Sequence, residues 1–451
     1  MKKNLPPSPP GHKLFGHITG FAKDPLNYMM KISREHGGIL YSRVINYKIV
    51  LISKPEYVKY ILQENNRNYT KTSGYKPLKL LLGKGLITSE GDLWLKQRRL
   101  FQPAFNRESI MNYTKIVGEC VDDLLLEWNN IDPDSKLLNV SHEMMKNTMV
   151  IVGRTLFSSD LSKDTALVWE WMTYALEYVN NRTKTYPFNF SSKIPLPKNI
   201  RFTKAVASLD NMLYRKIDER RKEKGDFTDL LSMMMSAKDE ETGKGMSDGQ
   251  LRDEIMTIFL AGHETTANAL TWTWYLLSQH QEIEEKLHRE LDEILKGEIP
   301  SYQNLGNLRY TAQVVQESMR LYPPVWMIGR RTINEDQIGQ YHIPKGVDVA
   351  ISPYVLHHHS EYWDQPEVFD PDRFSSENIK KQIPYSYIPF GGGPRLCIGE
   401  NFAMMEMILI VAKVAQKYKL LLPKGTKVEI GSSLTLRPKE DLKMELYKRV
   451  I

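Results

Sequence analysis

Apolar residues recur at helical spacing through most of the middle of the chain, from about residue 90 to residue 332, with short Pro, Asp, Asn and Gly breaks between helices. Alternating apolar and polar residues predict short strands on both sides of this part. The short elements predicted are helices over Pro25–His36 and Pro55–Asn65, a hairpin of Ile39–Val44 and Tyr47–Ser53 with its turn near Ile45-Asn46, and extended segments at Asp348–Pro353, Leu420–Leu422, Lys427–Ile430 and Lys443–Leu446. The predicted fold class is therefore mainly α with a minor β part.

The longest predicted helix runs from about Ser247 to His280. Its apolar residues are Leu251, Ile255, Ile258, Phe259, Ala269, Leu270, Leu276 and Leu277. The stretch Ser247-Asp248-Gly249-Gln250 resembles a capping box, in which a serine and a glutamine satisfy N–H groups of the first turn reciprocally. A helix of this length spans roughly 50 Å, so we expect it to cross the whole core.

The composition indicates a globular chain with a sizeable core, because 41% of the 451 residues are hydrophobic and 10% are aromatic. The formal net charge is +7, but no block of Lys and Arg stands out, which argues against nucleic acid as a partner. A basic face that docks an acidic protein fits this charge better.

Cysteine usage and the N-terminus bear on location. Two cysteines in 451 residues do not make a disulfide framework, which is typical of a reducing cytoplasm. Cys120 lies in an amphipathic helical stretch, and we interpret it as structural. No long apolar stretch follows the Pro-rich start, so no signal peptide and no stable membrane anchor are predicted.

The other cysteine lies in a segment of unusual chemistry, Phe390-Gly391-Gly392-Gly393-Pro394-Arg395-Leu396-Cys397-Ile398-Gly399. Glycines let a backbone approach a large planar ligand closely. A sulfur at a helix N-terminus faces free N–H groups that favour its anion, and Arg395 could reach an anionic edge of the same ligand. The alternative interpretation is a buried cysteine in a glycine-rich turn.

A second candidate is the polar stretch Ala261-Gly262-His263-Glu264-Thr265-Thr266 in the middle of the long helix. These residue types are unfavourable at a buried helix centre, so they indicate either a ligand site or a solvent-facing stripe. A threonine hydroxyl that bonds the carbonyl four residues back can loosen the helix, and Gly262 allows a ligand or a backbone to come close. A zinc-protease motif is excluded, because the second histidine that it needs falls on Ala267.

Both segments resemble signatures of the cytochrome P450 family. The positions that match its haem-binding motif Phe-x-x-Gly-x-Arg-x-Cys-x-Gly are Phe390, Gly393, Arg395, Cys397 and Gly399. The resemblance implies that Cys397 is the thiolate ligand of a haem b. The helical stretch is similar to the family's oxygen-activation motif, which implies that Thr265 donates a hydrogen bond during dioxygen activation and that Glu264 relays protons. His263 occupies a variable position of that motif, and we interpret it as structural.

Three positions match family elements that bind the haem propionates. Trp94 and Arg98 match a Trp-x-x-x-Arg helix element, in which both side chains can face one carboxylate. Arg330 aligns with a third propionate-binding position, although Arg331 beside it leaves this register open.

Two further motifs are interpreted as structural. Glu317, Arg320 and Arg373 match the family's Glu–Arg–Arg triad, whose role is to fix the fold behind the haem. The tract His357-His358-His359 is not expected to bind a metal, because adjacent residues of an extended chain point in alternate directions.

The resemblance extends from the Pro-rich N-terminus to the last predicted strands. It implies the cytochrome P450 fold, with a long central helix over a buried haem, in a single haem domain over residues 1–451. Within it we expect a β-containing part at about 1–70, a helical core at about 71–332, and the haem-binding loop with a C-terminal helix and strands at about 333–451. Microsomal members usually carry a membrane anchor, so a soluble, cytoplasmic, bacterial-type protein is expected here.

The leading prediction is a monooxygenase that inserts one oxygen atom from O2 into a lipophilic small molecule, such as a fatty acid or a terpenoid. NAD(P)H would supply electrons indirectly through a ferredoxin and its reductase, or a flavodoxin, to a monomeric enzyme. Arg99, Lys380 and Lys381 are candidates for the docking surface. The residues that alignment places in the substrate pocket are Phe259, Ala261, Val325, Trp326, Met327, Ser433 and Leu434.

Two alternatives remain open. A peroxygenase would keep the thiolate-bound haem and use peroxide, but such relatives typically lose the acid–threonine pair that this chain has as Glu264-Thr265. A haem-based binding or sensing protein would not require a proton-delivery pair, and no signalling segment is attached.

Overall fold

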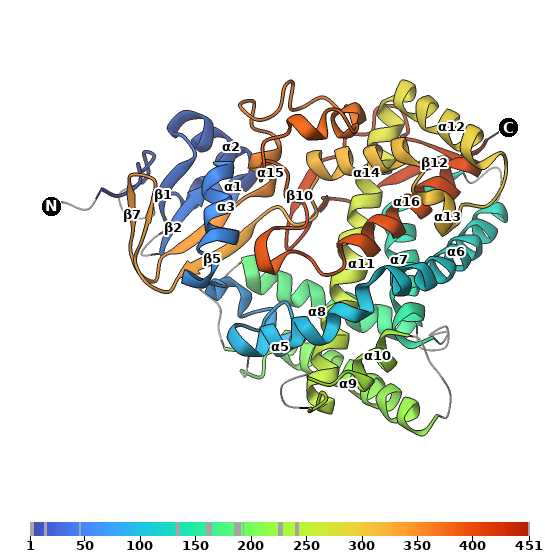
Figure 1. The fold of residues 1–451 in the computed structure, drawn as a ribbon, viewed down its shortest axis with the longest axis horizontal. Helices are drawn as coiled ribbons and strands as arrows, with labels where there is room; N and C mark the ends of the chain where they lie inside the picture. The colour runs from blue at the N-terminus through green and yellow to red at the C-terminus, as the bar shows by residue number, and fades with distance from the viewer. Residues whose placement is uncertain are drawn as a thin grey trace.

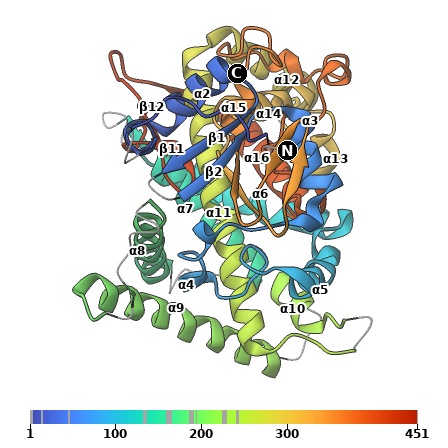
Figure 2. The ribbon, with the colours of Figure 1, turned by 90° about the vertical axis from the view of Figure 1, so that its left-hand side faces the viewer.

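The long helix predicted from the sequence forms the axis of the molecule. The structure is a computed structural model that describes residues 4–12, 16–44, 47–131, 136–158, 165–184, 191–192, 194–223, 229–239 and 243–449. The long helix, α11 (Asp248–Gln279), extends from α9 (Pro197–Lys222) at one end of the molecule to α12 (Gln281–Leu295) at the other (Figures 1 and 2).

The N-terminus of α11 is capped as predicted, but only from one side. The Ser247 hydroxyl accepts a hydrogen bond from the Gln250 backbone N–H at 3.3 Å. The predicted reciprocal bond, in which Gln250 Oε1 would accept from the Ser247 backbone N–H, is missing from the cap of α11 in the described residues. The motif therefore acts as a serine cap and not as a full capping box.

Helices dominate the described residues, which confirms the prediction of a mainly α fold with a minor β part. The other α-helices are α1 (Ile18–Lys23), α2 (Pro25–His36), α3 (Pro55–Lys59), α4 (Lys79–Leu82), α5 (Gly91–Phe101), α6 (Arg107–Asn129), α7 (Val140–Phe157), α8 (Thr165–Lys184), α10 (Leu230–Ser236), α13 (Tyr302–Leu305), α14 (Arg309–Leu321), α15 (Pro353–His357) and α16 (Glu400–Lys417). A π-helical turn at Tyr60–Glu64 continues α3, so the helix predicted over Pro55–Asn65 changes its winding midway.

The largest sheet within the described ranges lies at the N-terminal end of the molecule, away from α6 and α12 (Figure 1), and has the order β1-β2-β8-β5-β3. Its strands are β1 (Ile39–Val44), β2 (Tyr47–Ile52), β3 (Tyr69–Thr70), β5 (Ile328–Thr332) and β8 (Asp348–Ile351). The predicted hairpin is the antiparallel pair β1–β2, with Ile39 opposite Ile52, whereas β2 and β8 run parallel. The turn near Ile45-Asn46 lies outside the described residues.

Smaller sheets complete the β part. Their strands are β4 (Leu137–Asn139), β6 (Asp336–Ile338), β7 (Tyr341–Ile343), β9 (Tyr418–Leu421), β10 (Ile430–Ser432), β11 (Leu436–Pro438) and β12 (Lys443–Lys448). The strand predicted at Lys427–Ile430 is wrong in its bounds, because antiparallel pairing starts only where Ile430 faces Pro438. The residues before Ile430 follow a turn, in which Gly425 has a φ of +85° and the Thr426 N–H donates to the Pro423 carbonyl.

The closest helix packing at the centre joins α11 to α7. A Cβ atom at Gly262 would lie 2.7 Å from Cγ2 of Val152 on α7, which is too close for any side chain. The glycine of the polar stretch therefore serves the approach of a neighbouring helix. None of the described helices has the length and apolar character needed to span a membrane.

Candidate active site

Cys397 follows a tight loop that packs on the π-helical turn and leads into α16. The backbone N–H of Cys397 donates to the Phe390 carbonyl at 3.0 Å, and Leu396 N–H donates to the Gly393 carbonyl at 3.0 Å. Gly393 has a φ of +65°, and a Cβ there would lie 1.8 Å from the Leu62 carbonyl oxygen. The loop can therefore sit against residues 60–64 only because this position is glycine.

The Cys397 side chain is exposed, yet the protein around it desolvates its thiol. Such a thiol is open to a ligand although it is removed from bulk water. Burial raises the pKa of its thiol, and the Gly399 N–H and the Arg98 guanidinium only partly offset this. The Gly399 N–H favours the thiolate, as expected from the sequence, but desolvation of the thiol outweighs it in the protein alone. A metal cation bound to the sulfur would reverse that balance.

Two side chains of α5 meet the loop that carries Cys397. The Arg395 guanidinium stacks on the Trp94 ring, 3.7 Å from its centroid. Arg98 Nη1 donates to the Leu396 carbonyl at 2.8 Å. The structure therefore brings together the Trp94 and Arg98 predicted from one motif and the Arg395 predicted from another, about 300 positions apart in the sequence.

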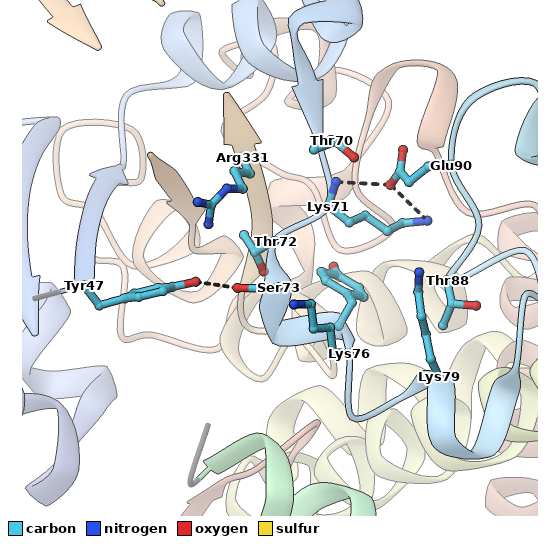
Figure 3. Close-up of a pocket in the computed structure, with 11 residues that line it drawn as sticks. Tyr47, Thr70, Lys71, Thr72, Ser73, Lys76, Lys79, Thr88, Glu90 and Arg331 are labelled. Carbon is cyan, nitrogen blue, oxygen red and sulfur yellow. Dashed lines mark hydrogen bonds and ion pairs between the residues drawn. The ribbon is translucent and has the colours of Figure 1, made fainter. Parts of the chain in front are cut away.

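A half-buried charge cluster that the sequence did not predict adjoins these residues. Arg395 Nη2 donates to Glu90 at 2.7 Å, and Lys71 Nζ lies 3.7 Å from the same carboxylate (Figure 3). Burial, together with the positive charges of Arg395 and Arg330, lowers the pKa of Lys71 to about 7. Burial also lowers the pKa of Arg395 to about 10.

These contacts test whether the site suits haem. Lys71 and Arg395 pair with the carboxylate of Glu90, and Arg98 and Arg330 add positive charge beside Arg395, so the cluster carries excess positive charge that a ligand with two carboxylates would balance. The charged neighbours of Arg330 and Arg331 also indicate which of the two faces the propionate position. Arg330 acts on Arg395 and Lys71, whereas Arg331 Nη1 pairs with Asp348 at 3.0 Å. Together with the thiol of Cys397, the residues fit the haem implied by the sequence.

On α11, the Thr265 hydroxyl donates to the Ala261 carbonyl at 2.7 Å, which is the four-residue back-bond predicted from the sequence. His263, two residues before Thr265, is buried, and its Nδ1 lies 2.7 Å from the Phe259 carbonyl. Burial lowers the pKa of His263. A buried ring that bonds its own helix agrees with the structural role assigned to it.

Glu264 is held by a partner that sequence reasoning missed. Its Oε1 accepts a hydrogen bond of 2.7 Å from the Thr435 hydroxyl, which in turn accepts one of 3.1 Å from Asn268 Nδ2. All three side chains are buried. No sequence signal marks Thr435, because it reaches α11 from the short connection between β10 and β11.

The predicted pocket residues separate into groups. Phe259 and Leu434 belong to one apolar cluster that also includes Ile398, the neighbour of Cys397, and Ala261 is half-buried on α11. Val325 and Met327 are 37% and 40% exposed. The remaining two residues are Trp326 and Ser433. Trp326 packs in the core around α2, and its indole N–H donates to the Ser433 carbonyl at 2.8 Å. The Ser433 hydroxyl accepts a hydrogen bond from Asn180.

The predicted triad is assembled around a fully buried carboxylate. Arg320 donates to Glu317 through Nε at 2.6 Å and Nη2 at 2.8 Å, and Asp370 N–H donates to it at 3.0 Å. Arg373 Nε lies 3.4 Å from Glu317, a looser ion pair.

The histidine tract is not the extended chain that the sequence predicted, because its first residue, His357, ends the short helix α15. His357 Nδ1 lies 3.2 Å from the Arg320 carbonyl, and its Nε2 accepts from Ile388 N–H at 2.9 Å. His358 Nδ1 lies 2.8 Å from the Tyr354 carbonyl. The His357 ring therefore links the triad to the segment before the Cys397 loop, whereas the His358 ring bonds its own helical turn.

A last buried group is Glu406 of α16, which the sequence reading passed over. It is fully buried, and neither carboxyl oxygen has a hydrogen bond of normal geometry, although the Thr266 hydroxyl faces it from α11. Burial raises its pKa well above the usual value. A lone Glu in the apolar run Met404–Val411 was the available signal.

Comparison with known proteins agrees with this geometry. The family model described as "Cytochrome P450" matches residues 6–445. Cyclooctatin synthase of Streptomyces melanosporofaciens is 36% identical over 95% of this chain and 93% of its own, and cyclooctat-9-en-7-ol 5-monooxygenase of the same organism is 34% identical over 92% and 89%. The crystal structure of the cytochrome P450DA heme domain superposes with a TM-score of 0.91 at 28% identity, covering 99% of this chain and 98% of that one.

The structural match confirms the predicted cytochrome P450 fold. Family membership also carries the coarser predictions, namely the use of haem iron and O2, redox partners and lipophilic substrates. Since the family model spans nearly the whole sequence and the relatives align over most of their own length, the chain belongs to the cytochrome P450 family and is a haem-dependent monooxygenase.

Proposed function

We propose that this protein hydroxylates a terpenoid, or a lipophile of similar size, with Cys397 as the thiolate ligand of haem b. The observation that carries the proposal is the convergence of Trp94, Arg98 and Arg395 on the loop of Cys397. These residues come from two distant segments, and they bring cations for carboxylates next to the sulfur of Cys397. Cysteine-ligated haem, when bound, supplies the iron chemistry that cleaves the O–O bond of dioxygen.

The residues around this centre have separate tasks in the proposal. Arg98, Arg330 and Arg395 pair with the haem carboxylates, Trp94 contributes its indole N–H, and Phe390 and Gly399 shape the loop. Lys71 joins this set because its amine lies in the same charge cluster.

On the other side, Thr265 and Glu264 of α11 hold and pass protons, since a hydroxyl and an acid side by side can deliver protons in sequence. Glu317, Arg320 and Arg373 keep the fold rigid behind the Cys397 loop. All of these parts belong to one haem domain in the proposal.

The substrate class rests on two supports. The apolar cluster that contains Phe259 and Leu434 includes Ile398 beside Cys397, so a lipophilic molecule would be desolvated there. The relatives reported above are named for cyclooctatin and cyclooctat-9-en-7-ol, and pentalenene oxygenase of Streptomyces avermitilis is 28% identical over 96% of this chain.

Electrons are proposed to come from NAD(P)H through a ferredoxin and its reductase, or through a flavodoxin. Arg99, Lys380 and Lys381 are exposed and offer positive charge for an acidic partner. The cytoplasm is the proposed compartment, because both cysteines are free thiols.

The test uses the purified holoprotein. The reduced protein with carbon monoxide should give the red-shifted band of a thiolate-ligated haem. NADPH with a ferredoxin and its reductase should then convert a member of a diterpene and fatty-acid panel into a product one oxygen atom heavier, detected by mass spectrometry. Turnover with hydrogen peroxide alone, and none with redox partners, would instead establish a peroxygenase. A normal band without turnover of any panel member under either condition would favour a sensing role.

A further inference from the structure

The amide side chain of Asn180, near the end of α8, binds the short connection between β10 and β11. Its Nδ2 donates to the Ser433 hydroxyl, and its Oδ1 accepts a hydrogen bond of 3.0 Å from the Leu434 N–H. One side chain therefore holds two consecutive residues, the first through its side chain and the second through its backbone. Because the amide uses both its donor and its acceptor, it fixes the direction of the connection as well as its distance.

The other end of the same connection holds the acid of α11. Thr435, the residue after Leu434, donates to Glu264 at 2.7 Å. The Ser433 N–H donates to the Thr435 carbonyl at 3.1 Å, and the Ser433 carbonyl accepts from the Trp326 indole N–H at 2.8 Å. Since these bonds make the connection one tight turn, a displacement of Leu434 also moves the hydroxyl that holds Glu264.

Helix α8 is itself part of the apolar cluster in which the lipophilic substrate is proposed to bind. It contributes Val168, Met172 and Val179 to this cluster, against which Leu434 and Ile398 pack. The polar chain thus leads from a helix beside the proposed substrate site to the buried centre of α11. Its members on α8 and in the first part of the connection are half-buried, whereas its last two members are buried.

We propose that Asn180 is a positioning residue for Glu264, because it seats α8 on the connection that fixes the direction of this acid. The proposal rests on the role in proton delivery proposed above for Glu264. Asn180 acts only through Thr435 and bonds to no reacting group. Without its two bonds the connection can shift, and the acid keeps its chemistry but loses its fixed direction. The expected defect is therefore a loss of coupling and not a loss of haem.

The first test measures the product formed per NADPH oxidised by the holoprotein with a ferredoxin and its reductase. The probe is the member of the diterpene and fatty-acid panel that the natural protein converts. Asn180→Leu keeps the approximate size of the side chain and removes both bonds, so coupling should fall at least about threefold, with a matching rise in hydrogen peroxide. Asn180→Asp should restore coupling, because a carboxylate accepts from both the Ser433 hydroxyl and the Leu434 N–H. Equal losses in the two variants overturn the proposal.

Tyr178→Phe is the matched control on the same helix. It removes a hydrogen bond that leads to α9, from the Tyr178 hydroxyl to Asn199 at 2.7 Å, and it should couple like the natural protein. Equal uncoupling in Tyr178→Phe and Asn180→Leu overturns the proposal, as does normal coupling in Asn180→Leu. Two further variants, Glu264→Gln and Thr435→Val, locate such a failure. If they uncouple, only the role of Asn180 is wrong, whereas normal coupling in both overturns the proton-delivery role on which it rests.

A second measurement is independent of turnover. Denaturant titration of Asn180→Leu, Thr435→Val and the double variant completes a double-mutant cycle. Residues that act through one turn give non-additive losses, so the unfolding equilibrium constant of the double variant should differ at least about twofold from the product of the single effects. Additive losses would show that the two contacts are independent, which overturns the proposal.

Discussion

The Thr435 hydroxyl donates a hydrogen bond of 2.7 Å to the carboxylate of Glu264. The acid at the centre of α11 is therefore fixed by a residue 171 positions away, in the connection between β10 and β11. Because Asn268 donates to the same hydroxyl, Thr435 links two residues of α11 that lie one turn apart. The direction in which Glu264 points depends on this strand connection as well as on its own helix.

Replacing Thr435 with Val keeps the shape of the side chain and removes the hydroxyl. Glu264 and Asn268 would then lose a buried partner, which should cost about 1–3 kcal/mol of unfolding free energy. Chemical denaturation measures this loss. Thr435→Ser keeps the hydroxyl and should stay closer to the natural protein, so equal stability of the Val variant and the natural protein would show that the bond contributes nothing.

Cys397→Ser should abolish the red-shifted band of the reduced carbon monoxide complex, because an alcohol does not replace a thiolate ligand. Cys120 is the internal comparison. It is buried, and burial raises the pKa of its thiol to about 12, so it stays protonated at any working pH. Cys120→Ala should therefore keep the band, and its loss there would overturn the assignment of the ligand.

The sequence predicted best the elements that depend on residues close together along the chain. The periodicity and the Ser247 cap place α11, and the motif around Cys397 places the thiol loop. What the sequence missed is long-range. Lys71 and Glu90 carry no motif, and only folding brings them to Arg395. Likewise Thr435 reaches Glu264 from a strand connection. The thiol of Cys397 shows the same limit: its local helix N-terminus favours the anion, but the burial that reverses this comes from the whole fold.

Glu317→Ala should destabilise the fold by about 3–5 kcal/mol, because it leaves the guanidinium of Arg320 buried without its carboxylate. Both side chains are fully buried. The pair Lys216–Glu219, in which Glu219 is exposed and Lys216 half-buried, has the same spacing of three residues on a helix and serves as the control. Glu219→Ala should change stability by less than about 0.5 kcal/mol. Denaturant titration of the two variants compares them, and similar losses would contradict the structural role of the triad.

Glu406→Gln should change how stability depends on pH. The pKa of Glu406 in the folded protein is raised by burial above its unfolded value. Such a group favours folding most below the unfolded pKa, and this contribution is lost as the pH rises toward the folded pKa, at up to about 1.4 kcal/mol per pH unit. Glutamine stays neutral, so the variant should gain stability relative to the natural protein between about pH 5 and pH 7.

Any constant effect of the Glu406→Gln amide drops out of this slope, which thermal unfolding across the pH range measures. Glu119→Gln gives the baseline, because it makes the same substitution at an exposed position. Parallel stability–pH curves for the natural protein and Glu406→Gln would show that Glu406 is ionised and paired in the fold.

The last prediction concerns Thr265, whose hydroxyl donates to the Ala261 carbonyl at 2.7 Å. Thr265→Ala removes the hydroxyl and raises helix propensity, so α11 should stay intact. Among the described residues, no hydrogen bond joins Thr265 to Cys397 or to the cation cluster, so haem uptake and the consumption of NADPH through redox partners should persist. The product formed per NADPH oxidised should fall at least about tenfold, since a positioned proton donor contributes about 10²-fold or more. The missing electrons should appear as hydrogen peroxide, which is assayed in parallel.

Thr271 provides a matched control on the same helix, because its hydroxyl makes the same bond to the carbonyl four residues back, Ala267, at 2.7 Å. Thr271→Ala therefore reproduces the loss of the back-bond without touching the Glu264-Thr265 pair, and its coupling should equal that of the natural protein. If both threonine variants uncouple equally, the effect comes from the geometry of α11 and not from proton delivery. Unchanged coupling in both Thr265→Ala and Glu264→Gln would exclude this pair as the relay, and protons would have to reach the site by another route.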